Sequence, residues 1–247
     1  MQRRRFEDDR TMGEGPHLAM LGSIVGDPSR ASMLGALMGG MALTAQELAR
    51  EAGVTPSTAS SHLAMLVDRG MLAVLQQGRH RYYRIADSDI AELLEGMMAF
   101  HAPGRRPGPT DPALRRARTC YDHVAGELGV RLFASLIDHG HLVLRGDGIA
   151  LSPSGETLLR DLGCVVARDA KPACRSCLDW SERRSHLGGR AGAALLGLFL
   201  ERGWVRRGPG RTLTVTPPGT IAIDRHFPLG EGTADEAQTK VVRAFFR

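Results

Sequence analysis

The spacing of apolar positions predicts helices over most of the N-terminal part of the chain. An apolar helical pattern runs over residues 18–38 and is interrupted at residues 26–28, where Gly-Asp-Pro favours a break. The next helix is expected to begin after Thr44, because Glu47 three residues later completes a capping box, and to end at Gly53. These signals predict a helical start to the folded chain.

A second capped helix follows almost immediately. Thr55 suits the N-cap position, Pro56 suits the first helical position, and Gly70 suits the stop. The apolar stripe of this helix consists of Leu63, Leu66 and Val67. A short helix, a tight turn that contains glycine and a second capped helix are typical of a helix-turn-helix.

A hairpin and a further helix are expected to complete this domain. Residues 72–86 have the pattern of two short strands that flank a Gly-Arg-His-Arg tip, and we interpret them as a wing. Residues 88–101 show the periodicity of an amphipathic closing helix. Residues 101–112 are rich in Pro, Gly and Arg and are expected to be a linker. We therefore expect one domain over residues 17–102 and another over residues 113–229.

The outer face of the second capped helix is unusually polar. Its first two turns contain Ser57, Thr58, Ser60, Ser61 and His62. Such residues disfavour a helix interior but suit base edges and phosphates in a major groove, so we expect them to bind DNA. The wing adds a segment with no acidic residue, which contains Arg79, His80, Arg81 and Arg84. We expect these residues to contact phosphates or the minor groove, and a solvated helix beside an ordinary hairpin is the alternative.

The second domain contains an internal duplication. Residues 123–143 and 186–206 share several residues at matched offsets. The matched pairs are His123 and His186, Gly126 and Gly189, Gly129 and Gly192, Leu132 and Leu195, Asp138 and Glu201, and Gly140 and Gly203. A hairpin-like stretch follows each helical pattern. The predicted fold is therefore mainly α with small β-hairpins, an α+β class in which two duplicated helix–hairpin units follow the winged helix.

The paired glycines near the start of each repeated helix indicate close packing. Gly inside a helix costs about 1 kcal/mol relative to Ala. Its presence at the same offsets in both copies therefore predicts a tight approach, either between the two helices or of a ligand bound beside them.

The second domain also holds every cysteine of the chain. Cys120 and His123 are expected on one helix face, while Cys174 and Cys177 precede the second repeated helix, which begins near His186. If the copies pack about a pseudo-twofold axis, Cys120, Cys177 and the two histidines meet at the seam between them.

Four interpretations of these residues remain open. The cysteines are buried apolar residues and the histidines bond at helix ends, or the thiols form a redox switch. Alternatively, Cys and His bind zinc or a softer thiophilic metal, or the seam binds a small organic effector. A single Cys-x-x-Cys is weak evidence for structural zinc, so no cofactor is assigned. The candidate effector residues are Cys120, His123, Cys174, Cys177, Trp180 and His186.

Trp180 follows Asp179 in this segment and has two interpretations. It packs at the domain seam, or it lines a pocket for an organic ligand.

Composition and charge narrow the class of protein. Hydrophobic residues make up 43% and charged residues 24%, which is ordinary for a globular chain. With no apolar run of roughly 18 residues and no signal-peptide pattern, we expect a cytoplasmic protein with reduced thiols and no membrane partner. The net charge is +5, but residues 1–102 contain 10 Arg against 12 Asp and Glu, so a DNA site there depends on local clustering.

Three stretches of the N-terminal domain resemble the ArsR family of bacterial winged-helix regulators, namely residues 25–37, 43–72 and 78–86. The resemblance includes Asp27-Pro28-Ser29-Arg30, the spacing of Ser60, His62 and Leu63, and Tyr82-Tyr83-Arg84. It implies a homodimer that is held by the first and last helices of the domain and binds an inverted-repeat operator in double-stranded DNA. Residues 118–129 and 177–189 also resemble segments of a long subfamily.

The chain departs from this family at the common metal sites. Residues 44–53 contain no Cys, and the last helix of the domain offers Asp87, Asp89 and His101 without a pair of histidines at helical spacing. Any sensing of a signal is therefore expected in the second domain.

These features together predict a sequence-specific DNA-binding transcriptional regulator, a dimeric repressor controlled by an effector or redox signal. The alternative is a winged-helix protein-interaction module whose wing does not touch DNA. We expect no enzyme, because thiol–disulfide exchange would need a thioredoxin-like βαβ setting that the pattern lacks. Residues 18–38 and 90–100 are expected to form most of the dimer interface, since both are more apolar than a solvated helix needs.

Overall fold

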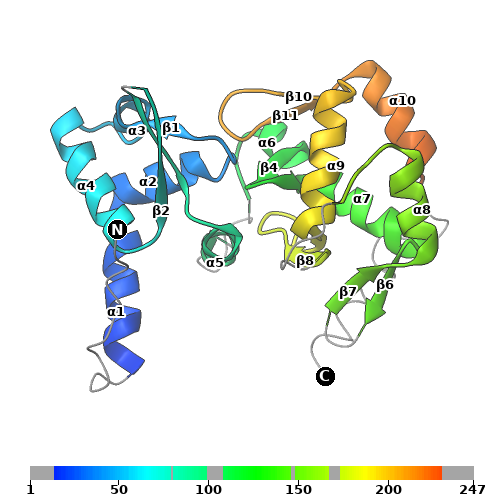
Figure 1. Cartoon of the computed structure of the whole chain (residues 1–247), viewed down its shortest axis with the longest axis horizontal. Coiled ribbons are helices and arrows are strands. Elements are labelled where there is room, and N and C mark those ends of the chain that lie inside the picture. Colours follow the sequence, from blue (N-terminus) through cyan, green and yellow to red (C-terminus); the bar gives the residue numbers. More distant parts are fainter. Residues whose placement is uncertain (1–13, 79, 99–107, 146–147, 167–172, 230–247) are drawn as a thin grey trace. The chain divides into compact units, whose positions relative to one another are not determined.

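The computed structural model describes residues 14–78, 80–98, 108–145, 148–166 and 173–229, which divide into two units (Figure 1). The first unit comprises the residues up to Leu37 together with Ala42–Ala86, and the second comprises Met38–Met41 together with the residues from Asp87 onward. None of the helices in these ranges is long and apolar enough to cross a membrane.

Helices form the body of the first unit. They are α1 (Glu14–Val25), α2 (Pro28–Leu37), α3 (Ala45–Glu51) and α4 (Pro56–Asp68). Thr44 caps α3 in a capping box with Glu47, and Thr55 caps α4, as the sequence predicts. Gly53 and Gly70 follow these helices with φ angles of 63° and 71°, which glycine adopts without strain. The buried side chains include Met33, Leu34, Leu37, Leu48, Leu63, Leu66 and Ile85.

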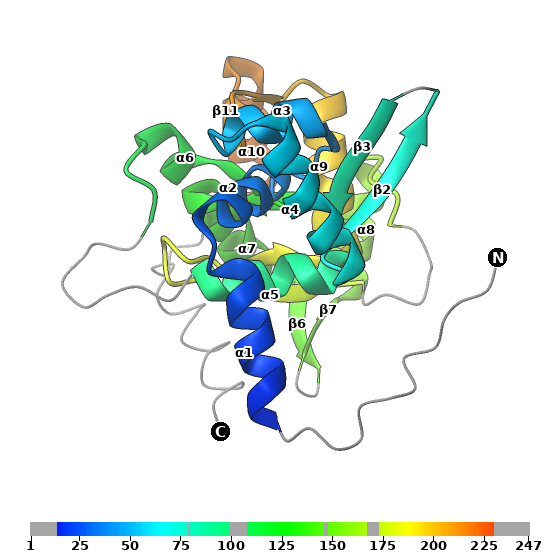
Figure 2. The same ribbon diagram turned by 90° about the vertical axis from the view of Figure 1, so that its left-hand side faces the viewer.

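A small antiparallel sheet completes the first unit. Its strands are β1 (Leu43–Thr44), β2 (Leu72–Gln77) and β3 (His80–Ile85), in the order β1-β3-β2. β2 and β3 run side by side, from Leu72 opposite Ile85 to Gln77 opposite His80, and form the predicted wing (Figure 2). β1 is an addition that the sequence pattern did not predict.

The second unit begins with two helices and continues with two copies of one arrangement. The two helices are α5 (Ser88–Met98) and α6 (Pro112–Arg116). The first copy consists of β4 (Arg118–Cys120), β5 (His123–Ala125), α7 (Gly126–Asp138), β6 (Leu142–Arg145), β7 (Gly148–Leu151) and α8 (Pro153–Asp161). The second copy consists of β8 (Arg175–Leu178), β9 (Ser185–Gly188), α9 (Gly189–Glu201), β10 (Val205–Arg207), β11 (Leu213–Val215) and α10 (Pro217–His226). Their shared core includes Phe133, Leu136, Leu195, Phe199, Trp204 and Phe227.

The predicted duplication is therefore present, but each copy is larger than a helix and a hairpin. A hairpin precedes each repeated helix, and a second helix ends each copy. Cys120 and His123 lie on paired strands of such a hairpin, so the prediction that they share a helix face is wrong. The repeated helices begin only at Gly126 and Gly189, where φ angles of 76° and 73° turn the chain out of the hairpin.

Gly129 and Gly192 allow the copies to pack closely. A Cβ atom at Gly129 would meet a carbonyl of the preceding strand and lie 3.3 Å from Cβ of His186. A Cβ atom at Gly192 would do the same in its own copy and lie 3.0 Å from Cβ of His123. Each glycine thus faces its own hairpin and the histidine of the other copy, whereas the sequence analysis favoured contact between the two helices.

The structure groups α5 with the second unit, although the expected N-terminal domain ran to residue 102. Glu95 of α5 is buried, and its carboxylate lies 3.9 Å from Arg118 and 3.4 Å from Arg211. A buried carboxylate remains with its cationic partners because separation would leave an uncompensated charge. Most of the expected linker at 101–112 lies outside the described residues.

We predict that Gly192→Ala destabilises the second unit and that Gly197→Ala, on the same helix, stabilises it. The first change overpacks a backbone carbonyl and costs about 1–3 kcal/mol. A Cβ atom at Gly197 meets no atom within 4 Å, so alanine there gains roughly 0.5–1 kcal/mol of helix stability. Urea unfolding followed by tryptophan fluorescence reports this unit, because both tryptophans, Trp180 and Trp204, belong to it. Equal midpoints for the two variants would contradict the packing described for Gly192.

Candidate functional site

The predicted DNA-reading face of α4 is exposed to solvent. Its exposed polar residues are Ser57, Thr58, Ser60 and Ser61. The Ser60 and Ser61 hydroxyls donate to the carbonyls of Pro56 and Ser57 at 2.8 and 3.3 Å. Each hydroxyl oxygen keeps its lone pairs as acceptors, so the face presents a row of small polar groups that suits base edges.

His62 lies differently from these four residues. Its side chain is only 18% exposed, with Nδ1 at 3.1 Å from the Arg30 guanidinium and Nε2 at 3.9 Å from the Asp27 carboxylate. Arg30 also donates to the backbone carbonyls of Ser23 and Ile24 at 2.7 and 2.6 Å. His62 therefore packs α4 against the junction of α1 and α2, which is not the base-reading position that the sequence analysis expected.

The wing presents part of its predicted basic segment. His80 and Arg81 are exposed at the start of β3, and Arg84 is half-buried farther along the same strand. Buried Tyr83 anchors the strand to the body of the unit. Arg79 at the tip lies outside the described residues.

The second unit brings together four of the six predicted effector residues in a cluster of two cysteines and two histidines. The cluster consists of Cys120, His123, Cys177 and His186, all buried, whose sulfur and ring nitrogen atoms lie within 4.8 Å of one another. Each hairpin supplies one pair, because Cys120 is the strand partner of His123 and Cys177 is the strand partner of His186. The pseudo-twofold packing that the sequence suggested thus places both pairs at the seam.

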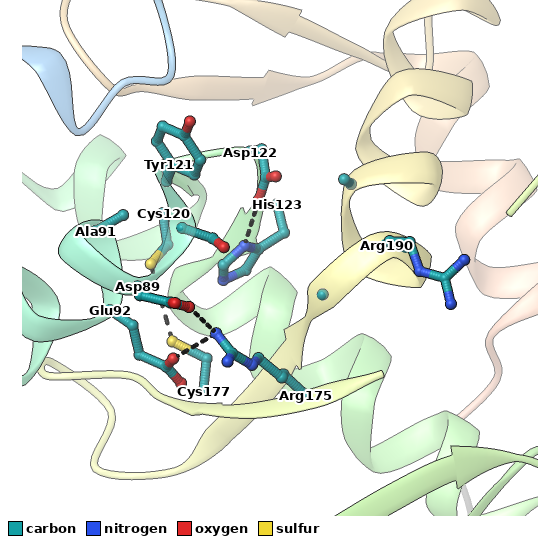
Figure 3. Close-up of a pocket in the computed structure, with 13 residues that line it drawn as sticks. Asp89, Ala91, Glu92, Cys120, Tyr121, Asp122, His123, Arg175, Cys177 and Arg190 are labelled. Atoms are coloured by element: carbon teal, nitrogen blue, oxygen red, sulfur yellow. Dashed lines mark hydrogen bonds and ion pairs between the residues drawn. The ribbon is translucent and has the colours of Figure 1, made fainter. Parts of the chain in front are cut away.

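Two short distances define the cluster. The sulfur atoms of Cys120 and Cys177 are 3.9 Å apart and point toward one another (Figure 3). The Nε2 atoms of His123 and His186 are 3.1 Å apart. Two bare nitrogen lone pairs would repel at this distance, so a proton or a metal ion must lie between the rings.

A carboxylate stands behind each histidine. Nδ1 of His123 lies 3.0 Å from the Asp122 carboxylate. Nδ1 of His186 lies 3.6 Å from Asp179 and has no hydrogen-bond partner among the described residues. Carboxylates in these positions favour a proton on Nδ1 of both rings, which leaves Nε2 to face the centre of the cluster.

Asp179 joins the two copies. Its carboxylate is completely buried and accepts hydrogen bonds from the Arg118 guanidinium, the backbone N–H of Gly126, and the N–H and hydroxyl of Ser181, at 2.7 to 2.9 Å. Burial raises the pKa of the Asp179 carboxyl, but Arg118 and the other donors outweigh this and lower the pKa below its usual range. An ionised Asp179 therefore ties the first hairpin and α7 to the loop after β8.

The environment shifts the pKa values of the two histidines of the cluster in opposite directions. Burial and the neighbouring His123 lower the pKa of His186 well below its ordinary value. Burial also lowers the pKa of His123, but Cys120 and Asp122 outweigh it and raise that pKa to about 10. Contact with Cys177 and burial raise the pKa of the Cys120 thiol well above its ordinary value. These shifts favour a proton on His123 over one on His186.

The other predicted effector residues lie away from the cluster. Cys174, like Cys164, is buried in the apolar core, and burial raises the pKa of each thiol to about 11. Cys174 and Cys177 are three residues apart along an extended segment, so their side chains point to opposite faces. Trp180 lies against the Arg118 guanidinium, with 5.3 Å from its carbon to the ring centroid, which is seam packing between the two copies.

A cavity of about 420 Å³ reaches the cluster from outside. Cys120, His123 and Cys177 form part of its wall, and the acidic side chains of Asp89, Glu92 and Asp122 lie on the same wall (Figure 3). Asp89 was expected only as a residue of the last helix of the N-terminal domain, and Glu92, Asp122, Arg118 and Glu95 were not predicted, because no local motif marks a carboxylate or guanidinium that is assembled from distant segments.

Comparisons with known proteins found similarity in both units. Residues 25–74 match a family model described as a helix-turn-helix domain. The chain is similar to the HTH-type transcriptional regulator YdfF of Bacillus subtilis (strain 168), with 38% identity over 220 residues that cover 86% of this chain and 97% of YdfF. A match of that length extends well beyond the winged helix.

Two further similarities are confined to the N-terminal part. The HTH-type transcriptional regulator CmtR of Mycobacterium tuberculosis (strain H37Rv) is 39% identical over 77 residues, which are 31% of this chain and 64% of CmtR. The solved homodimeric winged helix-turn-helix DNA-binding domain of Mb0332 from Mycobacterium bovis, a possible ArsR-family transcriptional regulator, is 24% identical. That match covers 36% of this chain and 86% of the domain, with a TM-score of 0.31.

We predict that Asp179→Asn destabilises the second unit by about 3–5 kcal/mol, because it removes the charge partner that hydrogen-bonds the buried Arg118 guanidinium at 2.7 Å. The matched control is Asp224→Asn, which removes an exposed carboxylate from its ion pair with Arg131 and costs less than about 1 kcal/mol. Urea unfolding followed by tryptophan fluorescence measures both variants. Similar small losses in the two would show that Asp179 does not hold the seam.

Proposed function

The chain belongs to the HTH-type transcriptional regulators, which are DNA-binding proteins, and we propose that it is a member of the ArsR family that acts in the cytoplasm as a homodimeric repressor on an inverted-repeat operator. The observation that carries this proposal is the exposed row of hydroxyls in the first two turns of α4. In helix-turn-helix proteins the N-terminal residues of the second helix contact base edges in the major groove.

The two parts of the DNA surface have different tasks. Ser57, Thr58 and Ser61 read bases, because short hydroxyl side chains on a helix approach base edges closely. Arg81 and Arg84 on β3 bind phosphates, and such contacts position the protein without reading sequence. His62 orients α4 through Arg30 and Asp27.

Exposed apolar side chains on two helices support a dimer. Leu18 and Met20 on α1 are 71% and 40% exposed, and Leu93 and Met97 on α5 are each 40% exposed. A second copy that covers these side chains removes apolar surface from water and places two α4 helices on one operator. Phe100, which the sequence analysis adds to this surface, lies outside the described residues.

The second unit is the proposed sensor. It holds a buried cluster of metal-binding residue types, a cavity that reaches them, and the helix α5 of the proposed dimer interface. A signal at the cluster thus has a physical route to the dimer, and a change in dimer packing alters the spacing of the α4 helices.

We predict that Ser61→Ala and Arg81→Ala weaken DNA binding in different ways. Ser61→Ala costs roughly 1–3 kcal/mol on an operator selected from a random duplex pool and little on random DNA. Arg81→Ala weakens both DNAs similarly and lowers the salt slope by about one. Fluorescence anisotropy over a range of salt concentrations measures both effects, and Arg160→Ala, which removes an exposed charge from α8, is the control. Equal losses of Ser61→Ala on both DNAs would remove Ser61 from the reading face.

We predict that Leu93→Glu and Met97→Glu convert a dimer into a monomer, because a carboxylate in the interface has no partner there. Sedimentation velocity at micromolar concentration measures this change. Ile221→Glu on α10 is the control, since Ile221 is 72% exposed outside the proposed interface and the variant remains a dimer. A parent protein that sediments as a monomer would refute the proposed dimer.

A further inference from the structure

We propose that Cys120, His123, Cys177 and His186 form a mononuclear tetrahedral site for a thiophilic divalent cation of the Zn²⁺ class. Each copy of the repeat supplies one thiolate and one imidazole to the ion. Bound metal therefore cross-links the two copies at their seam.

The distances between the side chains fit such an ion. Zn–S bonds of about 2.3 Å and Zn–N bonds of about 2.05 Å place two tetrahedral sulfurs about 3.8 Å apart and two nitrogens about 3.3 Å apart. The structure has 3.9 Å between the sulfurs and 3.1 Å between the nitrogens. These two distances match those of a tetrahedral site, and all four ligand atoms lie within 4.8 Å of one another. A disulfide would instead need the two sulfurs to close to about 2.05 Å.

The surroundings of the two histidines support the same assignment. Asp122 and Asp179 stand on the Nδ1 side of His123 and His186, so both rings direct Nε2 toward one point. This is the carboxylate–histidine–metal arrangement that orients imidazole ligands. A proton between the rings satisfies only the histidines, whereas a metal ion at this point also engages both sulfurs. Nδ1 of His186 is buried and has no hydrogen-bond partner among the described residues. In the proposed site this nitrogen faces away from the ion, on the side of Asp179.

The fold holds the ligands in place before any ion binds. Each Cys–His pair is fixed by strand pairing in its own hairpin. Gly129 and Gly192 admit the histidine of the opposite copy, which a side chain at either position would displace. Ligands held on strands in this way lose little freedom when the ion binds, which favours binding.

The cavity gives a metal ion access to the cluster, and the residue types at its end determine which ions bind. It opens onto Cys120, Cys177 and His123, and its wall carries three acidic side chains and two basic ones, namely Asp89, Glu92, Asp122, Arg175 and Arg190. The two thiolates and two imidazoles at its end select zinc-like and softer ions over Mg²⁺ or Ca²⁺, which prefer oxygen ligands.

Ion pairs connect this site to α5, and here the inference rests on the proposed function. Arg175, two residues before Cys177 on β8, donates to Asp89 and Glu92 of α5 at 3.1 and 2.7 Å. Arg118, which bonds Asp179 behind His186, lies 3.9 Å from Glu95 of the same helix. Because the bound ion cross-links the two hairpins, these pairs connect metal occupancy to α5, and operator affinity differs between the metal-free and metal-bound states.

Metal binding to the full-length protein without DNA tests the site. The chain is reduced, stripped of metal with a chelator and titrated with Co²⁺ as a spectroscopic probe. We expect one ion per chain, with the intense visible bands of tetrahedral cobalt and a thiolate charge-transfer band, both abolished by Zn²⁺. Cys120→Ser, Cys177→Ser and His186→Gln lose these spectra. The control variants Cys164→Ala and Cys174→Ala change cysteines of the apolar core and keep them.

Alkylation of the cysteines in the parent protein, with and without Zn²⁺, tests the site even if a variant fails to fold. Added Zn²⁺ is expected to protect Cys120 and Cys177 from alkylation, as mapped by peptide mass spectrometry, and to leave the rates at Cys164 and Cys174 unchanged. Absence of stoichiometric Co²⁺ or Zn²⁺ binding by the reduced parent would overturn the site. Uniform protection of all cysteines would also overturn it, as would a Cys120–Cys177 disulfide in a protein that binds no metal.

Operator binding with and without Zn²⁺ tests the connection to α5 separately. We expect a change of roughly 5- to 150-fold in operator affinity, which is lost in Cys177→Ser and retained in Cys174→Ala. A parent that binds Zn²⁺ but shows equal operator affinity in both states refutes the connection and leaves the site intact. A parent that binds Zn²⁺ and no DNA of any sequence refutes the proposed function and not the metal site.

Discussion

The buried ion pair between Arg118 and Asp179 is the interaction on which the second unit depends. Arg118 lies on the first hairpin of one copy and Asp179 on the loop of the equivalent hairpin in the other, and both side chains are completely buried. Two buried charges are tolerated only when each is fully paired, because an isolated charge in the interior costs several kcal/mol. Asp179 also bonds the first backbone N–H of α7 at Gly126. A single carboxylate thus fixes the position of a hairpin, a helix and the seam.

The arrangement of the cysteines and histidines follows from this seam. A two-stranded hairpin is marginally stable alone, so each hairpin needs the packing of the other copy to keep its shape. Once the seam is closed, the cross-strand pairs Cys120–His123 and Cys177–His186 face one another without further adjustment. The duplication therefore does more than enlarge the core, because it brings together four residues of metal-binding type from two equivalent halves, each of which supplies only two of them.

The two units differ in how their properties arise. In the first unit, local sequence signals agree with the observed helix boundaries. The capping box at Thr44, the cap at Thr55 and the glycines after α3 and α4 all mark real boundaries. In the second unit, α5 is bound by buried and partly exposed ion pairs that run from Glu95, Asp89 and Glu92 to three arginines of the repeat region. A helix that contributes to the proposed dimer surface and is also held by the proposed sensor region is suited to transmit a change in either direction.

By itself, the sequence determined the winged helix-turn-helix, the duplication and the types of residue at the seam. Helix caps, turn glycines and apolar periodicity act over a few residues, so they can be read from the chain. It did not determine that residues 118–125 and 175–188 form hairpins, because short strands with few alternating positions resemble helix ends. Nor did it reveal that His62 turns inward to Arg30, or that Cys174 separates from Cys177. Tertiary structure decided these points, because His62 meets Arg30 across 32 residues of the chain, and the thiol, histidine and buried-charge contacts that hold the two hairpins join residues 57 to 63 positions apart.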